Sequence, residues 1–341
     1  GAETMAGFPI EKVVCGLSGG RPITKIIRNQ LKIDSGRVMK SDLIKIHKIN
    51  DLIGINNYTP LSINPIKYYI DKNSPVDNPI GMHTDNLTLD TSITYGKKNV
   101  MQNFASAIEL CHLFAEKFII SPEASGVSTM TKDEREHGAI VIDLGGNITS
   151  IGVFINDKIV FSDSIPIGGI HITSDIVRGL GTKSEDAEKI KILYGSALSN
   201  ETDEYTSIEI PIISDEGEII NQQIPKAMLT AIIKPRIEET FELVKERLNY
   251  FKRNSNFSNK VILCGGGANL NNIREFASTF LNTNVRIGRP IGLIGLPEIV
   301  QTPTFSCLAG LLIKSLEEEK VPIEQQMNLG LFNYLGKIGN W

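Results

Sequence analysis

The amino-acid sequence predicts an α/β protein of two lobes with an additional small subdomain near its N-terminus. Three observations lead to this fold class: an apolar strand that enters a glycine turn and a hairpin over 139–164, a charged helix over 184–195, and a strand–Gly-Gly-Gly–helix unit over 260–272. The chain has 341 residues, enough for about two domains at roughly 150 residues each.

The first part of the chain predicts a small mixed α/β unit. Its predicted strands, each a run of continuous or alternating apolar residues, are 13–17, 24–33 and 62–70. Residues 41–52 have a charged helical pattern, for which Ser41 is the expected N-cap and Asp42 is an acid in the first turn.

The middle of the chain predicts a strand near 87–95 and then a helix over 98–116, whose apolar residues recur at helical spacing. A second apolar block follows over 118–131. The hairpin after it is the clearest element, with predicted strands over 139–144, 150–155 and 158–164.

The remainder of the chain is expected to be mainly helical. Its predicted elements are, in order, two helical pieces within 171–198, strands and loops over 199–224, a long charged helix over 226–253, a strand over 260–264, a helix from about 271, a helix over 304–318 and a separate tail over 327–341.

Composition narrows the classes of function. Lys plus Arg number 35 and Asp plus Glu number 39, so the formal charge of −4 argues against a nucleic-acid binder that works by bulk charge. No apolar run approaches the roughly 20 residues of a membrane-spanning helix. The four cysteines form no CxxC pair, which argues against a disulfide framework or a zinc site and favours a reducing cytoplasm.

The first candidate site is the run 143–149, with the sequence DLGGNIT. A carboxylate at the end of a buried strand, followed by glycines, suits a Mg–phosphate group. Backbone N–H groups can approach the phosphates there, while Asp143 can hold the metal through water. An ordinary hairpin with a glycine turn fits the same run. The sequence contains neither the P-loop pattern nor the dinucleotide-binding glycine pattern.

The second candidate is the turn made by Gly265, Gly266 and Gly267 after an apolar strand. Without side chains, such a turn lets the backbone lie close to a nucleoside. A tight strand–helix connection has the same pattern.

The third candidate is one face of the charged helix, where Glu188, Lys191 and Gly195 lie at helical spacing. A carboxylate there can bind ribose hydroxyls, and a lysine stem can cover an adenine ring. A solvated charged face is the alternative for this helix alone.

The order of the three motifs is that of an actin-like ATPase core, in which two ribonuclease-H-like halves close around one nucleotide. The small residues of 122–126 and 303–310 would let two helices cross closely between the halves. The fold class predicted from this order is therefore the actin-like two-lobed fold.

The chain resembles the bacterial cell-division protein FtsA over nearly its whole length. The glycine loops alone would not separate FtsA from heat-shock chaperone ATPases or from MreB. Residues 12–84 are the discriminating feature, because FtsA carries an extra subdomain (1C) there. The matching stretches are 1–7 (GAETMAG), 17–21 (LSGGR), 139–146 (AIVIDLGG), 172–176 (ITSDI), 184–191 (SEDAEKIK) and 285–288 (VRIG).

This resemblance implies a polymerising, actin-like cell-division protein that binds ATP and Mg, with hydrolysis weak or absent. It would anchor the tubulin-like FtsZ ring to the inner face of the cytoplasmic membrane at the division site. The FtsZ C-terminal peptide is expected on about 196–258, whereas 12–84 would serve filament contacts and later divisome proteins; no nucleic acid is expected. Carried over by position, the phosphate and Mg residues are Asp143, Gly145, Gly146 and Thr149, and the nucleoside residues are Glu188, Lys191, Gly195, Gly265, Gly266, Gly267 and Asn269.

The resemblance also implies a division of the chain into subdomains. The expected parts are 1–84 as the extra subdomain, 85–168 with 303–318 as the core of lobe one (1A-like), 169–302 as lobe two (2A/2B-like) with the nucleoside loop, 319–326 as a linker, and 327–341 as an amphipathic membrane-targeting tail. The first strands of lobe one would precede Gly1, so we expect an N-terminally truncated chain.

Several residues depart from the family pattern. The family's phosphate loop reads D-x-G-G-G-T-T, whereas this chain has Asn147 at the third glycine and Ile148 at the first threonine. Asn can adopt left-handed backbone geometry, but Ile148 has no hydroxyl for a phosphate. Together with the expected absence of the first phosphate loop, this predicts poor nucleotide binding and no hydrolysis. Glu123 lies near the place of a water-positioning base in chaperone relatives, where this chain has Ser121, and we assign no catalytic residue.

The tail 327–341 has an amphipathic helical pattern suited to a bilayer interface. A helix packed on a neighbouring domain is the alternative. The residues expected to contact the membrane are Leu331, Phe332, Tyr334, Leu335, Ile338 and Trp341.

Two other functions share this fold. A PilM-like component of pilus assembly has the same core and a similar extra subdomain, and the 184–191 helix together with the amphipathic tail favours FtsA over it. A sugar or acetate kinase would need a general-base Asp between the halves, and none is identified in the sequence.

Overall fold

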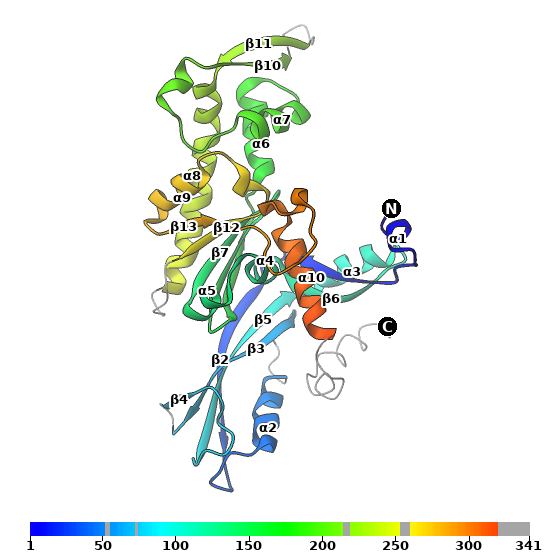
Figure 1. Cartoon of the computed structure of the whole chain (residues 1–341), viewed down its shortest axis with the longest axis vertical. Helices are drawn as coiled ribbons and strands as arrows, with labels where there is room; N and C mark the ends of the chain where they lie inside the picture. The colour runs from blue at the N-terminus through cyan, green and yellow to red at the C-terminus, as the bar shows by residue number, and fades with distance from the viewer. Residues whose placement is uncertain (52–54, 72–73, 214–218, 253–259, 320–341) are drawn as a thin grey trace.

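The computed structural model describes residues 1–51, 55–71, 74–213, 219–252 and 260–319. Figure 1 shows an elongated molecule with a small sheet and helix α2 at one end and the β10–β11 hairpin at the other. A larger sheet and two crossing helices, α4 and α10, lie between them. Among the described residues, no helix is both long enough and apolar enough to cross a bilayer.

The central sheet has five strands in the order β13-β12-β7-β8-β9. The first three are parallel to one another, and β8 and β9 continue antiparallel as the predicted hairpin. Both faces are covered, which explains why β7 is a continuous apolar run rather than an alternating one. The strands are β7 (Ala139–Leu144), β8 (Thr149–Ile155), β9 (Lys158–Ile165), β12 (Val261–Cys264) and β13 (Val285–Ile287).

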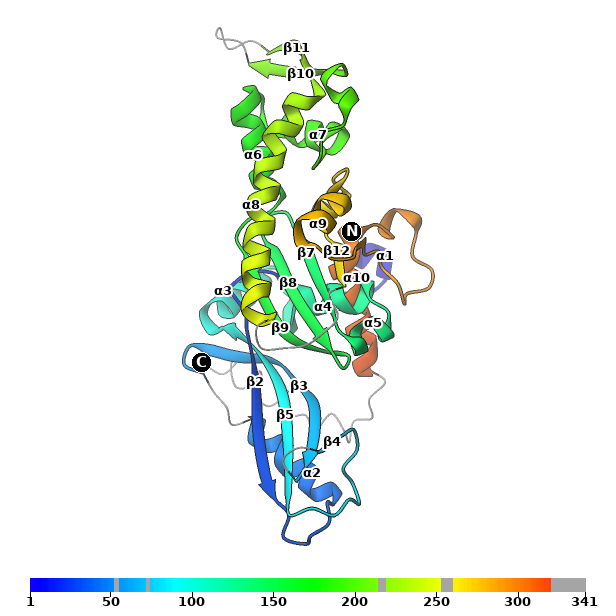
Figure 2. The same cartoon turned by 90° about the vertical axis from the view of Figure 1, so that its left-hand side faces the viewer.

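Alternate residues of β7 point into two separate cores. Ile140 and Ile142 join the core that includes residues of α8 and α9, whereas Val141 joins the core on the side of α4. Figure 2 shows α8 running along one face of the sheet. The helices of this face are α8 (Lys226–Lys252) and α9 (Ile273–Leu281), and those of the other face are α4 (Ser121–Thr129) and α5 (Lys132–His137). Helix α10 (Ser306–Glu319) packs on α4.

Helices α4 and α10 cross so closely that their backbones touch. A Cβ added at Gly310 of α10 would collide with the carbonyl of Ala124 in α4. On the same side of the molecule, β1 (Lys12–Leu17) and β6 (Phe114–Ile120) form a two-stranded parallel sheet. The expectation that small residues allow two helices to cross here is confirmed.

The small sheet has the order β2-β5-β3-β4 and is antiparallel. Helix α2 (Lys40–Asp51) packs on it through Ile46, which lies in one core with Leu87 and Leu89. Ser41 does not cap this helix, contrary to the prediction. The Asp42 carboxylate accepts the Met39 N–H at 3.0 Å instead, because an acid at the third helical position can reach back to the cap. The strands are β2 (Ile23–Lys32), β3 (Tyr58–Ile70), β4 (Ser74–Val76) and β5 (Asn86–Lys97).

The helix predicted over 98–116 is shorter in the structure. Helix α3 (Lys98–Glu109) ends before an exposed turn, in which His112 has a positive φ of 58°. The chain then enters β6, whose Ala115 and Phe118 are buried in the core near α4. The end of the predicted helix is therefore a turn followed by the start of a strand, which a helical periodicity could not distinguish over so few residues.

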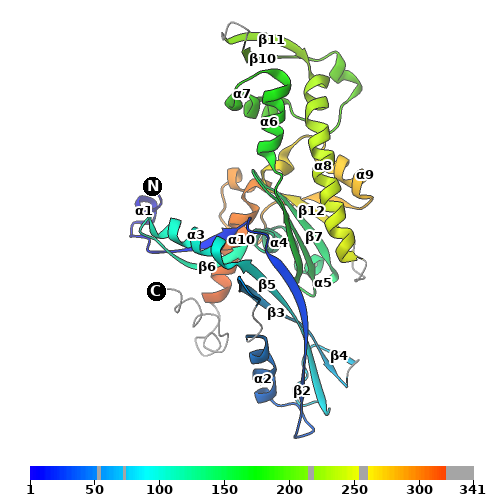
Figure 3. The same ribbon diagram turned by 180° about the vertical axis from the view of Figure 1, so that it is seen from behind.

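The far end of the molecule consists of the β10–β11 hairpin and the helices beneath it, as Figure 3 shows from behind. The hairpin strands are antiparallel. Its elements are α6 (Gly169–Leu180), α7 (Ser184–Tyr194), a 3-10 turn (Glu201–Glu204), β10 (Ser207–Ile213) and β11 (Ile219–Pro225). The short helix α1 (Ala2–Ala6) lies at the N-terminal end.

The sheets divide the chain differently from the expected subdomain boundaries. The hairpin β7–β9, expected in lobe one, shares hydrogen bonds with β12, which was expected in lobe two. Strand β5 lies beyond the boundary expected at 84 but is central to the small sheet. The central sheet therefore spans the expected boundary at 168, and the small sheet spans the one at 84.

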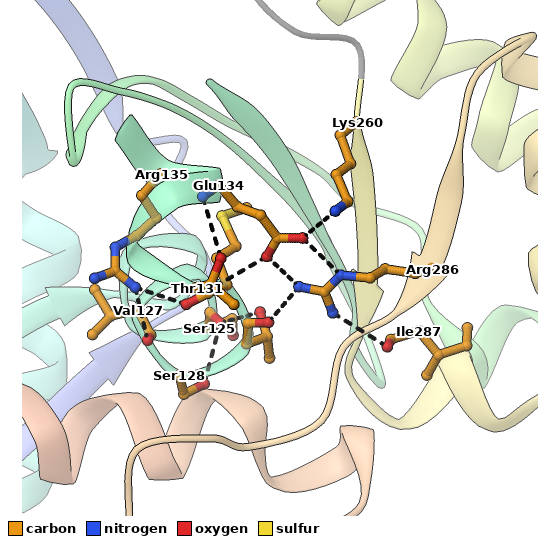
Figure 4. Close-up of polar contacts among 11 residues, drawn as sticks. Ser125, Val127, Ser128, Thr131, Glu134, Arg135, Lys260, Arg286 and Ile287 are labelled. Atoms are coloured by element: carbon orange, nitrogen blue, oxygen red, sulfur yellow. Dashed lines mark hydrogen bonds and ion pairs between the residues drawn. The ribbon is translucent and has the colours of Figure 1, made fainter. Parts of the chain in front are cut away.

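A polar network ties α5 to the edge of the central sheet (Figure 4). The Glu134 carboxylate binds Lys260, just before β12, at 2.5 Å and Arg286 of β13 at 2.5 Å. It also accepts the Thr131 N–H as part of a capping box that starts α5. The network lies at the start of β7 and β12, the end of the sheet opposite to Asp143.

Candidate functional site

The first candidate residue, Asp143, lies at the carboxyl end of β7 and is buried. The Ser125 hydroxyl of α4 donates to its Oδ2 at 2.6 Å. Burial raises the pKa of Asp143, and the hydrogen bond from Ser125 opposes this rise. The carboxylate is thus connected to one of the two crossing helices.

The glycine loop after Asp143 is tied to the start of α6. The carbonyl of Gly145 accepts the Gly169 N–H at 3.0 Å, and that of Gly146 accepts the Ile170 N–H at 2.8 Å. The approach is so close that a Cβ at Gly168 would lie 2.6 Å from the Gly146 carbonyl oxygen. A glycine at 168 is therefore needed for the loop and the helix to meet.

The residues at the end of the glycine loop differ in what they can offer a ligand. The Thr149 hydroxyl is buried and donates to the Ile167 carbonyl at 2.8 Å, so in this arrangement it serves the backbone. Ile148 faces the turn after β1, where a Cβ at Gly19 would lie 3.2 Å from Ile148 Cδ1. Asn147 and Gly146 are exposed at the tip of the loop.

The charged helix α7 presents a compact pair rather than a solvated face. Lys191 Nζ donates to Glu188 Oε2 at 2.6 Å, to Thr173 Oγ1 at 2.9 Å and to the Gly169 carbonyl at 3.0 Å. Partial burial raises the pKa of Glu188, but hydrogen bonds from Lys191 and Thr173 and the charge of Lys191 outweigh it and leave the pKa below its ordinary value. Glu188 is therefore a carboxylate at neutral pH.

The glycine run after β12 wraps around the end of β7. Gly265 has a positive φ of 81°, and a Cβ at this position would collide with Asp143 Oδ1. Its N–H donates to the Pro303 carbonyl at 2.9 Å. Asn269 Nδ2 donates to Thr304 Oγ1 at 3.0 Å, so the run is connected to the segment that leads into α10.

The end of α7 meets the same glycine run. The Gly195 carbonyl accepts Asn271 Nδ2 at 3.1 Å, and Ser196 and Asn271 form an isolated parallel bridge. The 145–146 loop is thus linked to the Glu188–Lys191 pair through Gly169, and the end of α7 is linked to the 265–269 run through Asn271, which follows that run. The fold brings all three sequence motifs to one place.

Three residues of this arrangement escaped the sequence analysis as site residues. Ser125 holds Asp143, Gly168 permits the loop to approach α6, and Thr173 contacts both members of the Glu188–Lys191 pair. The paired glycines at 168 and 169, three residues after the end of β9, are a usable signal for close backbone approach. Ser125 and Thr173 carried no such signal.

The other residues considered in the sequence either make contacts away from the site or lie outside the residues that the structure describes. Glu123 forms an ion pair with Lys314 of α10 at 2.9 Å. The six tail residues expected at the membrane, Leu331 to Trp341, lie outside the described residues. Within the described part of the chain, no three His, Cys, Asp or Glu side chains gather as a metal-ligand cluster.

In the comparison with known sequences, the family model and the similar proteins given below all have the same family description. The family model described as Cell division protein FtsA matches residues 140–310. Cell division protein FtsA of Agrobacterium fabrum strain C58 is 34% identical over 318 residues, which cover 92% of this chain and 71% of that protein. The Rhizobium meliloti strain 1021 protein is 32% identical over 345 residues, with 100% and 78% covered. The Escherichia coli K12 protein is 26% identical over 351 residues, with 100% and 83% covered.

Comparison with solved structures gives the fold. The PilM–PilN type IV pilus biogenesis complex matches with a TM-score of 0.60 at 15% identity, covering 92% of this chain and 82% of that chain. The crystal structure of MreB5 of Spiroplasma citri bound to AMPPNP matches with a TM-score of 0.51 at 20% identity, covering 67% of each chain. The chain has an actin-like α/β fold similar to these two.

Proposed function

Because the chain belongs to the FtsA family of cell-division proteins, we propose that it is an actin-like scaffold that anchors the FtsZ ring to the inner face of the cytoplasmic membrane and helps to assemble the divisome. The observation that carries this proposal is the 34% identity over 92% of the chain. The match with the Rhizobium meliloti protein covers 100% of the chain and so includes residues 12–84, which separate FtsA from other actin-like proteins.

The site supports the binding of an adenine nucleotide with Mg. Glycines at 145, 168 and 265 leave no room for side chains, so backbone can lie close to phosphate and nucleoside. Asp143 would hold Mg through water, because Mg is usually bound through one or two carboxylates and phosphate oxygens. MreB5, which shares the fold, has been crystallised with AMPPNP.

The roles of the protein side chains follow from their positions. Glu188 would accept hydrogen bonds from ribose hydroxyls, and the stem of Lys191 would cover the adenine ring. Gly195 and the run from Gly265 to Asn269 would close the nucleoside side. Gly145, Gly146 and Thr149 would face the phosphates, and use of the Thr149 hydroxyl would require it to leave the Ile167 carbonyl.

We expect hydrolysis by this site to be weak or absent. Ile148 has no hydroxyl for a phosphate, and Glu123 is held by Lys314 in an ion pair. An actin-like scaffold can use nucleotide binding to set its conformation without turnover.

The FtsZ C-terminal peptide would bind the surface of about 196–258, and 12–84 would contact neighbouring copies and later divisome proteins. Several large apolar side chains are exposed within the first of these ranges and could contact such a peptide. They are Tyr205, Ile219, Ile220 and Met228.

Membrane attachment would come from the amphipathic tail 327–341. With one lysine in this segment, burial of apolar side chains rather than charge attraction must supply most of the binding. The full chain should sediment with liposomes and carry FtsZ with it, whereas a chain ending at Gln326 should leave both in the supernatant. Equal sedimentation of the two chains would remove the anchor from the proposal.

The likeness to PilM is a likeness of fold, since the identity is 15%. The relatives at 26–34% identity are FtsA proteins. We therefore base the proposed function on FtsA and not on pilus assembly.

A further inference from the structure

Thr173 lies in the second turn of α6 and points at α7 rather than at solvent. Its side chain is buried, with 3% of the residue exposed. The hydroxyl lies 2.5 Å from Glu188 Oε2 and accepts a hydrogen bond from Lys191 Nζ at 2.9 Å. A single hydroxyl on one helix thus contacts both charged groups of the neighbouring helix.

The hydroxyl proton has two acceptors within reach, and one is favoured. The Gly169 carbonyl lies at 3.0 Å, one helical turn back, and the Glu188 carboxylate is closer and charged. Charge-assisted hydrogen bonds are shorter and stronger than neutral ones. Thr173 therefore donates to Glu188 while it accepts from Lys191.

Both partners of Glu188 use the same carboxylate oxygen. Thr173 and Lys191 contact Oε2, and no contact of Oε1 is seen within the residues that the structure describes. The side chain of Glu188 is 46% exposed, so Oε1 can receive a ligand from solvent. Two fixed contacts on Oε2 hold the carboxylate plane and so determine where Oε1 points.

Further hydrogen bonds connect the surroundings of Thr173 to the glycine loop. Lys191 Nζ also donates to the Gly169 carbonyl, and the Gly169 N–H donates to the Gly145 carbonyl of the glycine loop. The Glu188 carboxylate is thereby connected through α6 to the loop at Asp143. A group that orients Glu188 from α6 holds it relative to that loop.

We propose that Thr173 is a positioning residue that makes the site select ribonucleotides over deoxyribonucleotides, by holding Glu188 so that Oε1 meets a ribose hydroxyl. The inference rests on the proposed nucleotide site and adds to it the residue that determines sugar specificity. A site built to hydrogen-bond a substrate hydroxyl rejects the analogue without it, but only when the acceptor is held in place.

The test compares three single substitutions of the full chain. Thr173→Val removes the hydroxyl and keeps the shape, Thr173→Ser keeps the hydroxyl, and Ser174→Ala is the matched control. Ser174 is the next residue of the same helix, and its hydroxyl donates only to the Ile170 carbonyl at 2.9 Å among the contacts seen in the described chain. Equilibrium dialysis with Mg-ATP, 2′-deoxy-ATP and 3′-deoxy-ATP, up to millimolar nucleotide, gives ratios that remain informative when binding is weak.

We expect the wild-type chain to prefer ATP over at least one deoxy analogue by about tenfold or more, as for a hydrogen bond to a charged group. Thr173→Val should bring that ratio to within about threefold of unity, chiefly by weakening ATP, whereas Thr173→Ser and Ser174→Ala should keep the wild-type ratio. Thermal unfolding of each variant confirms that it folds.

Three outcomes would overturn the inference. If Thr173→Val weakens ATP and the deoxy analogues equally, Thr173 has only a structural role. If the wild-type chain binds nucleotide but does not discriminate, Glu188 does not read the sugar. If the wild-type chain binds no nucleotide at all, the proposed nucleotide site fails, and this inference fails with it.

Discussion

Glu134 shows how one carboxylate can hold separate elements of this molecule together. Partial burial would raise its pKa, but hydrogen bonds from Arg286, Lys260 and the Thr131 N–H lower the pKa from 4.5 to about 2. Its side chain is 11% exposed, so solvent screens these contacts less than it screens a surface pair. The charged form of Glu134 therefore stabilises the folded state.

Glu134→Gln should destabilise the protein by about 2–3 kcal/mol at neutral pH, because the pKa shift of a carboxylate measures the difference in its interactions between the two states. The folded pKa is below the unfolded one, so this contribution is complete above about pH 4.5. It is lost as the pH falls through about 2. Urea unfolding of the wild type and the variant over this pH range checks the prediction.

The matched control is Glu136→Gln on the same helix. Glu136 pairs with Lys132 at 3.4 Å, and both side chains are well exposed, so its loss should cost less than about 0.5 kcal/mol. A Glu134→Gln variant that matches this control at neutral pH would contradict the account of the network.

At the residue scale, the sequence predicts the candidate site residues that a short local pattern indicates. Asp143 was selected as a candidate because it ends a buried strand before glycines, and Glu188 and Lys191 because helical spacing puts them on one face. Ser125 and Thr173 could not be found in this way. Their partners, Asp143 and Glu188, lie 18 and 15 residues away, and only the packing of different elements brings each pair together.

At the element scale, the predicted positions of helices and strands were mostly right, and the errors were at their ends. Helix α3 ends at Glu109 because the chain then turns, with a positive φ at His112, before it enters β6. Helix α2 begins one residue before Ser41, since the carboxylate of Asp42 reaches the cap. The first error arises where a helical pattern continues into a turn, and the second arises from a cap contact only three residues long.

The crossing of α4 and α10 allows a prediction at this scale. Gly310→Ala should destabilise the protein by about 2–3 kcal/mol, because the added methyl group collides with the Ala124 carbonyl and overpacking costs of this size are usual. Alanine is the better helix former by about 1 kcal/mol, so helix propensity alone predicts the opposite sign. Thermal or urea unfolding measures the difference.

Gly266→Ala is the matched control for this substitution. No atom lies within 4 Å of a Cβ at Gly266, and its φ is not positive, so the stability should stay close to that of the wild type. If Gly310→Ala were as stable as this control or more stable, the result would contradict the close backbone contact between α4 and α10.

At the scale of the whole molecule, the motif order predicted the actin-like fold, whereas the subdomain boundaries did not follow from it. The hairpin β7–β9 and the strand β12 are separated by more than 90 residues in sequence yet share one sheet. Parallel pairing between distant strands depends on the helices that cover both faces. The local sequence of a strand therefore does not specify its partner in the sheet.

The chain as a whole is proposed to connect FtsZ with the membrane, and the contact with FtsZ is its central claim. Binding of a labelled FtsZ C-terminal peptide to the full chain, followed by fluorescence anisotropy, tests it most directly. We predict saturable binding that a scrambled peptide does not reproduce and that Tyr205→Ala weakens, because Tyr205 is 88% exposed on the proposed surface. Binding no stronger than that of the scrambled peptide would contradict the account.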